Sequence, residues 1–136
     1  PDEIVVTLDK LRHKIEDYQD EIEKLRLDWM DDAEVAIVSY GSVSRTTLEA
    51  VMQAREAGIK AGCVQLLTIW PFPSKRLREI LLNTRNVIVA ELNMGQLIHE
   101  VERMAPRTVS VHSLLRYDGE IFTPAQIIEK IQEVSS

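Results

Sequence analysis

Short apolar runs alternate with amphipathic stretches over most of the chain. Four of these runs are rich in Val and Ile and are bounded by polar or turn-forming residues, which is typical of strands buried on both faces of a sheet. They lie at residues 35–40, 63–69, 86–91 and 107–112. After each run, apolar residues recur at the spacing of one helical face. This alternation predicts βαβ units, a mainly parallel sheet and a three-layer α/β/α domain.

Turn-forming residues mark several ends of these predicted elements. Gly58 closes a helical stripe, because glycine readily adopts the left-handed backbone of a C-terminal cap. Pro71 ends the second strand, since proline cannot donate a hydrogen bond to the sheet. The last helix is expected to open with a capping box, in which Thr123 and Gln126 bracket Pro124 at the first helical position.

The first 32 residues follow a different pattern. Apolar residues from Leu8 to Tyr18 recur at steps of three and four, which predicts a helix over residues 8–18. Leu25, Leu27 and Trp29 alternate at a period of two, which suits a strand, but the same region also continues the helical spacing. We therefore divide the chain into residues 1–32, a helix and an edge strand leading in from an upstream domain, and residues 33–136, the α/β domain.

Composition narrows the functional classes. The 136 residues carry a net charge of −6, which argues against binding to a nucleic-acid backbone, and no apolar run approaches the roughly 20 residues of a membrane span. A cytoplasmic protein is expected. Cys63 is the one cysteine, so the chain contains neither an internal disulfide nor the thiolates for a zinc or iron–sulfur site. Because the chain begins at Pro1, we expect it to be a fragment.

Three stretches of sequence resemble a known family. They occupy residues 32–42, residues 66–73, and residues 89–96 with their continuation at residues 100–103. In this order and spacing they resemble the alpha subunit of 2-oxoacid:ferredoxin oxidoreductases, of the 2-oxoglutarate-like type. The most specific parts are Trp70–Pro73 and Glu91–Gln96. The resemblance covers essentially the whole chain.

The resemblance implies a fold and a reaction. The fold is that of the transketolase C-terminal domain, with a mostly parallel five-stranded sheet, one antiparallel edge strand, and the strand order first, third, second, fourth, fifth. This favours the strand interpretation of Leu25–Trp29. The implied reaction decarboxylates a 2-oxoacid on thiamine diphosphate, passes electrons through iron–sulfur clusters to ferredoxin, and transfers the acyl group to coenzyme A.

The chain itself lacks the machinery that this reaction needs. A thiamine site requires a Gly-Asp-Gly…Asn stretch to hold magnesium and diphosphate, whereas the one Asp-Gly pair, Asp118-Gly119, has no preceding glycine. Iron–sulfur clusters need several cysteines. We therefore assign no catalytic, cofactor-binding or metal residue, and expect an inactive supporting domain. Its expected partners are the remaining alpha-subunit domain and the beta subunit, with ferredoxin and coenzyme A serving the whole complex.

The implied strand order places a crevice where the order reverses, beyond the ends of the strands at Tyr40 and Glu91. Its candidate lining residues are Tyr40, Gly41, Ser42, Glu91, Asn93, Met94, Gly95 and Gln96. An anion pocket at two helix N-termini is one interpretation. We favour the other, in which these residues form turns and helix caps and contact a neighbouring domain.

Individual residues within these segments also carry alternatives. Glu91 is interpreted as a structural carboxylate bonded to a backbone N–H or an arginine rather than as a general base. Trp70 and Phe72, held between prolines, form either a preformed contact surface or a cover for the domain's own core.

Two rival functions remain open. One is the C-terminal domain of a pyruvate dehydrogenase-type decarboxylase subunit, which shares the fold. The other is a free-standing nucleotide- or flavin-binding module. The second lacks a G-x-G-x-x-G turn, because Gly41 is the only glycine in the turn that directly follows the first core strand.

Overall fold

The computed structural model describes residues 25–41, 43–67, 72–92, 96–116 and 122–135. The predicted helix at residues 8–18 lies outside them. The described elements follow in the order β1 (Leu25–Asp28), β2 (Val35–Tyr40), α2 (Val43–Glu56), β3 (Ala61–Leu66), α3 (Ser74–Leu81), β4 (Asn86–Leu92), α4 (Leu97–Met104), β5 (Ser110–Arg116) and α5 (Pro124–Ser135). Strands and helices alternate after β1, as the hydrophobic pattern predicts.

The described strands form one five-stranded sheet in the order β1-β3-β2-β4-β5. Strand β1 runs antiparallel to β3, and the remaining neighbours are parallel. The predicted fold class, the strand order and the antiparallel edge strand are therefore confirmed. Strand β1 ends one residue earlier than expected, because Trp29 has a positive φ of 64° that turns the chain out of the strand.

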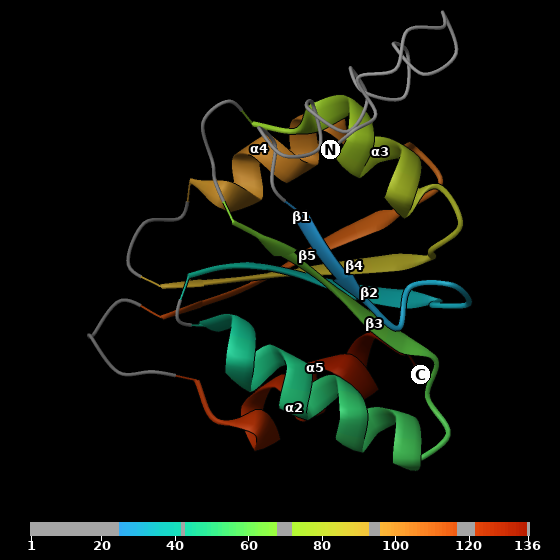
Figure 1. The fold of residues 1–136 in the computed structure, drawn as a ribbon, viewed down its shortest axis with the longest axis vertical. Coiled ribbons are helices and arrows are strands. Elements are labelled where there is room, and N and C mark those ends of the chain that lie inside the picture. The colour runs from blue at the N-terminus through green and yellow to red at the C-terminus, as the bar shows by residue number, and fades with distance from the viewer. Residues whose placement is uncertain (1–24, 42, 68–71, 93–95, 117–121, 136) are drawn as a thin grey trace, which may run out of the picture.

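Helices cover both faces of the sheet, with α2 and α5 on one side and α3 and α4 on the other (Figure 1). Alternate strand residues point to opposite faces. Val35 and Ile37 of β2 pack with α2 and α5, while Ala36 and Val38 of the same strand pack with α3 and α4. Each face thus has its own apolar core, which is the arrangement expected for continuous apolar strands.

Two strands begin and end at other residues than the sequence predicts. Strand β3 begins at Ala61 and ends at Leu66, because the chain pairs with β2 from Val35 onward and bends at residue 67. Its second residue, Gly62, passes so close to the chain just after β1 that an added Cβ would lie 2.6 Å from the Trp29 carbonyl oxygen. Glycine is therefore favoured inside this strand.

Strand β5 begins three residues later than predicted and extends to Arg116. The reason is a turn in which the Val109 N–H donates to the Pro106 carbonyl, so that pairing with β4 starts at Ser110. The helix caps predicted at Gly58 and at Thr123 with Gln126 are confirmed. Gly58 has a φ of +89°, and the Thr123 and Gln126 side chains each accept a hydrogen bond from the other's backbone N–H.

Candidate functional site

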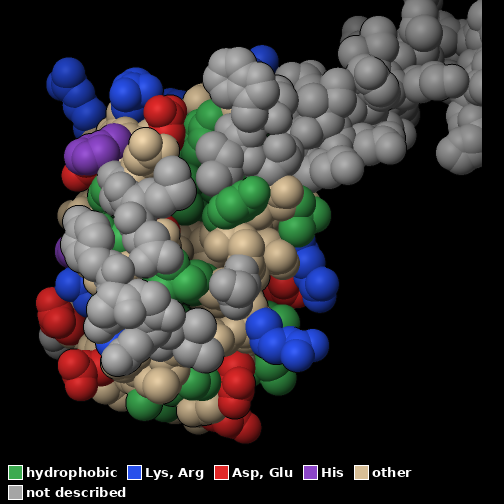
Figure 2. Space-filling view, turned by 90° about the vertical axis from the view of Figure 1, so that its left-hand side faces the viewer, with side chains coloured by type: hydrophobic (Ala, Val, Ile, Leu, Met, Phe, Trp, Pro, Cys, Tyr) green, Lys and Arg blue, Asp and Glu red, His purple; other side chains and the backbone are tan. Residues whose placement is uncertain are grey.

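The carboxyl ends of the four parallel strands meet at one edge of the sheet, which we call the carboxyl edge. The strand order reverses between β2 and β4, which are direct neighbours there. Figure 2 views the molecule onto this edge, where charged side chains lie mainly around the rim of the described surface. Of the candidate residues, Tyr40, Gly41, Phe72, Glu91 and Gln96 are described. Ser42, Trp70, Asn93, Met94 and Gly95 lie outside the described residues.

Glu91 is buried at the end of β4, and its carboxylate caps helix α4. Oε1 accepts a hydrogen bond from the Leu97 N–H at 3.0 Å, and Oε2 accepts one from the Ile98 N–H at 3.1 Å. These N–H groups belong to the first turn of α4, where a negative charge is also favoured by the helix dipole. The predicted backbone partners of Glu91 are thus present, and both oxygens are occupied by structural bonds.

Phe72 and Gln96 behave as structural residues in the described part of the chain. Phe72 is half-buried and packs against the apolar core on the α3/α4 side. It therefore covers the domain's own core, which was one of the two interpretations. Gln96 is exposed at the start of α4, and its side chain makes no capping hydrogen bond. The cap comes instead from Glu91, five residues earlier in the chain.

Two apolar side chains are exposed at the carboxyl edge, at the ends of neighbouring strands. Tyr40 is 43% exposed and Leu67 is 49% exposed. Tyr40 ends β2 and pairs with Leu66, the residue before Leu67, at the end of β3. The sequence did not single out Leu67, since the whole run at residues 63–69 was interpreted as strand. The structure therefore adds a second exposed apolar side chain to the predicted surface.

A cavity of about 410 Å³ lies beside this edge, on the face of the sheet that α2 covers. Residues of β1, β2 and β3 and the first turns of α2 line it, including Arg26, Gly41 and Arg45. Apart from Gly41, sequence reasoning did not single these residues out. The signal that places them together is the antiparallel pairing of β1 with β3, which sets Arg26 opposite Gln65.

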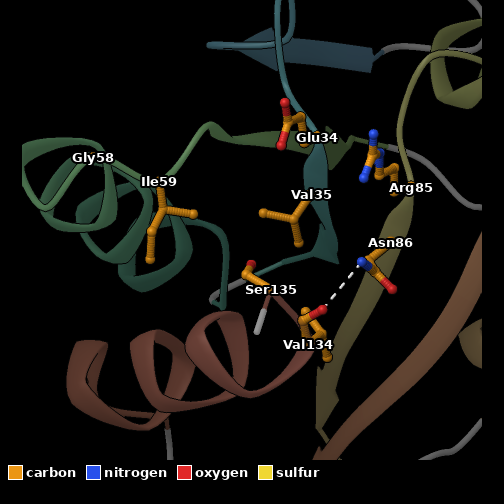
Figure 3. A pocket seen from close by; sticks show the side chains of 8 residues that line it. All are labelled: Glu34, Val35, Gly58, Ile59, Arg85, Asn86, Val134 and Ser135. Carbon is orange, nitrogen blue, oxygen red and sulfur yellow. Dashed lines mark hydrogen bonds between the residues drawn. The ribbon is translucent and has the colours of Figure 1, made fainter.

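A second cavity, of about 340 Å³, lies at the opposite edge of the sheet. Figure 3 shows Val35 and Ile59 pointing toward each other inside it, with Glu34 and Arg85 nearby. The Asn86 side chain donates a hydrogen bond to the Val134 carbonyl at 3.2 Å. This cavity lies where the end of α5 meets the sheet. The Asn86 side chain already bonds the helix to the sheet there.

The described titratable groups offer little chemistry. Burial raises the pKa of the Cys63 thiol to about 12, so the thiol stays protonated at neutral pH and fills apolar space, as expected. No group of three His, Cys, Asp or Glu residues that could hold a metal ion occurs within the described ranges. Among these same residues, no helix is both long and apolar enough to cross a membrane.

Comparison with known proteins gives a consistent family. The sequence profile of the pyruvate:ferredoxin oxidoreductase core domain II matches residues 33–127. The 2-oxoglutarate synthase subunit KorA of Methanothermobacter marburgensis is 38% identical over 122 residues, covering 90% of this chain and 32% of that protein. The chain spans about a third of the length of the curated relatives it matches first.

Solved structures share the fold. The 2-oxoglutarate:ferredoxin oxidoreductase from Magnetococcus marinus, solved with 2-oxoglutarate, coenzyme A and succinyl-CoA bound, superposes with a TM-score of 0.73 at 24% identity, over 91% of this chain and 22% of that chain. An inactive beta4 tetramer of a split-gene transketolase superposes with a TM-score of 0.63 at 21% identity, over 79% of this chain and 40% of that one. These likenesses show the fold.

Proposed function

Since this chain belongs to the pyruvate:ferredoxin oxidoreductase core domain II family, we propose that it is the supporting domain of the alpha subunit of a 2-oxoacid:ferredoxin oxidoreductase. The observation that carries the proposal is the family match over residues 33–127. The whole enzyme would oxidatively decarboxylate a 2-oxoacid in the cytoplasm, form an acyl-CoA and pass electrons to ferredoxin. We infer that residues 1–32 lead in from an upstream domain of the same subunit.

The supporting role follows from how the described polar groups are used. Both carboxylate oxygens of Glu91 cap α4, and the Cys63 thiol is buried and protonated. The residues of this chain do not fit a thiamine site, because the Gly-Asp-Gly stretch is missing from the sequence. Thiamine diphosphate, magnesium and the iron–sulfur clusters would be held by other parts of the enzyme, so we derive no reaction step in this domain.

We infer further that the carboxyl edge contacts the rest of the enzyme. Tyr40 and Leu67 support this, because two large apolar side chains lie exposed at the ends of the neighbouring strands β2 and β3. Loops beyond the ends of parallel strands can be shaped for a partner without disturbing the core. Trp70 lies in the same stretch of chain, and tryptophan is enriched among the residues that dominate interface energies.

A pair of leucine substitutions tests this contact surface. Leu67→Ser should weaken assembly of the full enzyme by about tenfold or more, since a buried leucine contact contributes roughly 1.5–3 kcal/mol. Leu82→Ser is the matched control, because Leu82 is 52% exposed, as compared with 49% for Leu67. Leu82 lies just after the C-terminal end of α3, whereas Leu67 comes before the N-terminal end of that helix. Assembly is measured by titrating the alpha subunit against its beta subunit.

The same experiment separates contact from chemistry. Trp70→Ala is expected to weaken assembly by roughly 2 kcal/mol or more, the usual threshold for an interface hot spot. Turnover per assembled complex should stay nearly unchanged in Leu67→Ser and in Trp70→Ala. Normal assembly combined with a loss of about a hundredfold in turnover, or approximately 2.7 kcal/mol, would place these residues in the chemistry instead.

A further inference from the structure

The cavity beside helix α2 holds a buried pair of serine hydroxyls with an unused proton. Ser39 is 1% exposed and Ser44 is 9% exposed, and their Oγ atoms lie 3.1 Å apart. Two hydroxyls carry two protons, and their mutual hydrogen bond uses one. The other proton has no acceptor among the described residues. Since both side chains line the cavity, this donor is available to a group that enters it.

Two guanidinium groups flank the same cavity from different elements. Arg45 extends from the first turns of α2 and forms no ion pair with any described residue, whereas Arg26 comes from β1 and bonds through Nε to Asp28 Oδ2 at 3.2 Å. Arg26, Asp28 and Arg45 together leave one net positive charge in a chain whose total charge is −6. The local charge is therefore opposite to that of the whole protein.

The backbone leaves room between these donors. Gly41 lines the cavity with a φ of +75°, and a Cβ atom added to it would meet nothing within 4 Å. The available space, of about 410 Å³, is lined by both arginines and by the hydroxyl pair. Gln65 on β3 adds a neutral amide to the lining. Donors from three strands and one helix thus face one open volume.

We propose that this cavity binds the phosphate group of a small ligand. Phosphate suits the site because its several acceptor oxygens can take hydrogen bonds from the serine proton and from both guanidinium groups at once, and arginine binds phosphate strongly through paired N–H donors. The site lies beside the carboxyl edge, on the opposite face of the sheet from Glu91. It therefore adds a binding function to a domain that otherwise supports the enzyme.

Phosphate binding is tested with inorganic phosphate and the 136-residue chain, by calorimetric titration at constant ionic strength. The expected result is saturable binding at one site. Arg45→Gln and Ser44→Ala should each weaken it about tenfold, the factor that corresponds to the loss of a single hydrogen bond of roughly 1.4 kcal/mol. Arg85→Gln is the matched control, because it removes the same charge from an exposed arginine at the other cavity.

The outcomes are distinguishable. Loss of affinity in Arg45→Gln and Ser44→Ala but not in Arg85→Gln supports the site. Equal losses in Arg45→Gln and Arg85→Gln would show general charge attraction, and an absence of saturable binding to the unmodified chain would equally overturn the proposal. A parallel titration with glycerol phosphate identifies the source. Tighter binding of the ester than of inorganic phosphate at the same residues assigns a phosphate ester, whereas equal or weaker binding assigns free phosphate.

Discussion

The two edges of the sheet use their polar side chains differently. At the edge where the parallel strands begin, which we call the amino edge, Arg55 and Asn86 tie segments far apart in sequence to one another. At the carboxyl edge, Glu91 ties the end of β4 to α4, while Tyr40 and Leu67 extend into solvent. Both edges expose large apolar side chains, since Trp29 and Leu82 are exposed at the first, but the first is held by bonds between segments far apart in sequence, whereas the Glu91 bonds at the second are local.

Arg55 is the main tie of the amino edge. It donates through Nε to the Ala61 carbonyl at 2.7 Å, and through Nη2 to the Trp29 carbonyl at 2.8 Å and to Asp32 Oδ1 at 2.7 Å. Its guanidinium also lies over the Trp29 ring, 5.6 Å from the centroid. One side chain near the end of α2 thus fixes the loop after β1 and the start of β3, in the region where Trp29 adopts its positive φ.

We infer that the amino edge stabilises the fold, whereas the carboxyl edge provides surface for contacts. Side chain-to-backbone bonds at the amino edge satisfy carbonyl groups that would otherwise lie unpaired where the chain turns, and they fix the relative positions of the strands. The carboxyl edge can then carry exposed loops without loss of the fold. Substitutions at the amino edge should therefore reduce stability, whereas those at the exposed part of the carboxyl edge should reduce assembly.

The largest effect on stability is expected for Arg55→Ala. The change leaves the Ala61 and Trp29 carbonyls without their charged donor, and each such bond contributes about 1.5 kcal/mol or more, so the free energy of unfolding should fall by roughly 3 kcal/mol. Urea unfolding measures it. Arg45→Ala on the same helix is the control and should change stability by less than about 0.5 kcal/mol, because Arg45 is exposed. Similar losses in both variants would remove the distinction between them.

A smaller loss is expected for Glu91→Ala at the carboxyl edge. Removing a helix cap of this kind costs about 1–2 kcal/mol, and burial places Glu91 toward the upper end of that range. Glu91→Gln should lose less, since its one carbonyl oxygen can still accept from the Leu97 or Ile98 N–H. Urea midpoints of the three proteins therefore give a graded series. A glutamine variant as unstable as the alanine variant would contradict the capping role.

The sequence predicted the local features of this molecule and missed its distant ties. Strand β2, the Gly58 cap and the Thr123–Gln126 capping box depend on neighbouring residues, and the hydrophobic pattern or turn chemistry identifies them directly. Arg55 reaches Trp29 across 26 positions, and Asn86 reaches Val134 across 48. No spacing rule connects such pairs, so they emerge only when the strand order brings them together.

The candidate site shows the same division. Glu91 was recognised as a structural carboxylate because a charge that ends an apolar strand needs a partner, but which N–H groups it meets depends on the path of the turn before α4. Leu67 was hidden inside a run that resembles a strand. Arg26 and Arg45 carried no local signal at all, since their common cavity exists only after β1 pairs with β3.

The smallest effect concerns His112, which belongs to the ties of the amino edge through Asn86. The Asn86 amide nitrogen donates to the Val134 carbonyl, so its oxygen is the acceptor and His112 Nε2, 2.9 Å away, carries the donated hydrogen. Protonation at the other ring nitrogen would leave this bond intact. Any pH dependence must therefore come from placing a positive charge in the partly buried site rather than from breaking the contact.

Burial, and next the charge of Lys130, hold the pKa of His112 below its ordinary value of 6.5, with Glu133 acting in the opposite direction. The unfolded chain therefore binds this proton more readily than the folded one. The stability contributed by the neutral ring is complete above pH 6.5 and is lost as the pH falls through the lower folded pKa. Comparing urea midpoints at roughly pH 7.5 and pH 5.5, which bracket an ordinary histidine pKa, should show a smaller decrease for His112→Gln than for the unmodified chain. His99→Gln, at an exposed position on α4, should keep the full decrease, and an unchanged decrease in His112→Gln would assign the acid sensitivity to other groups.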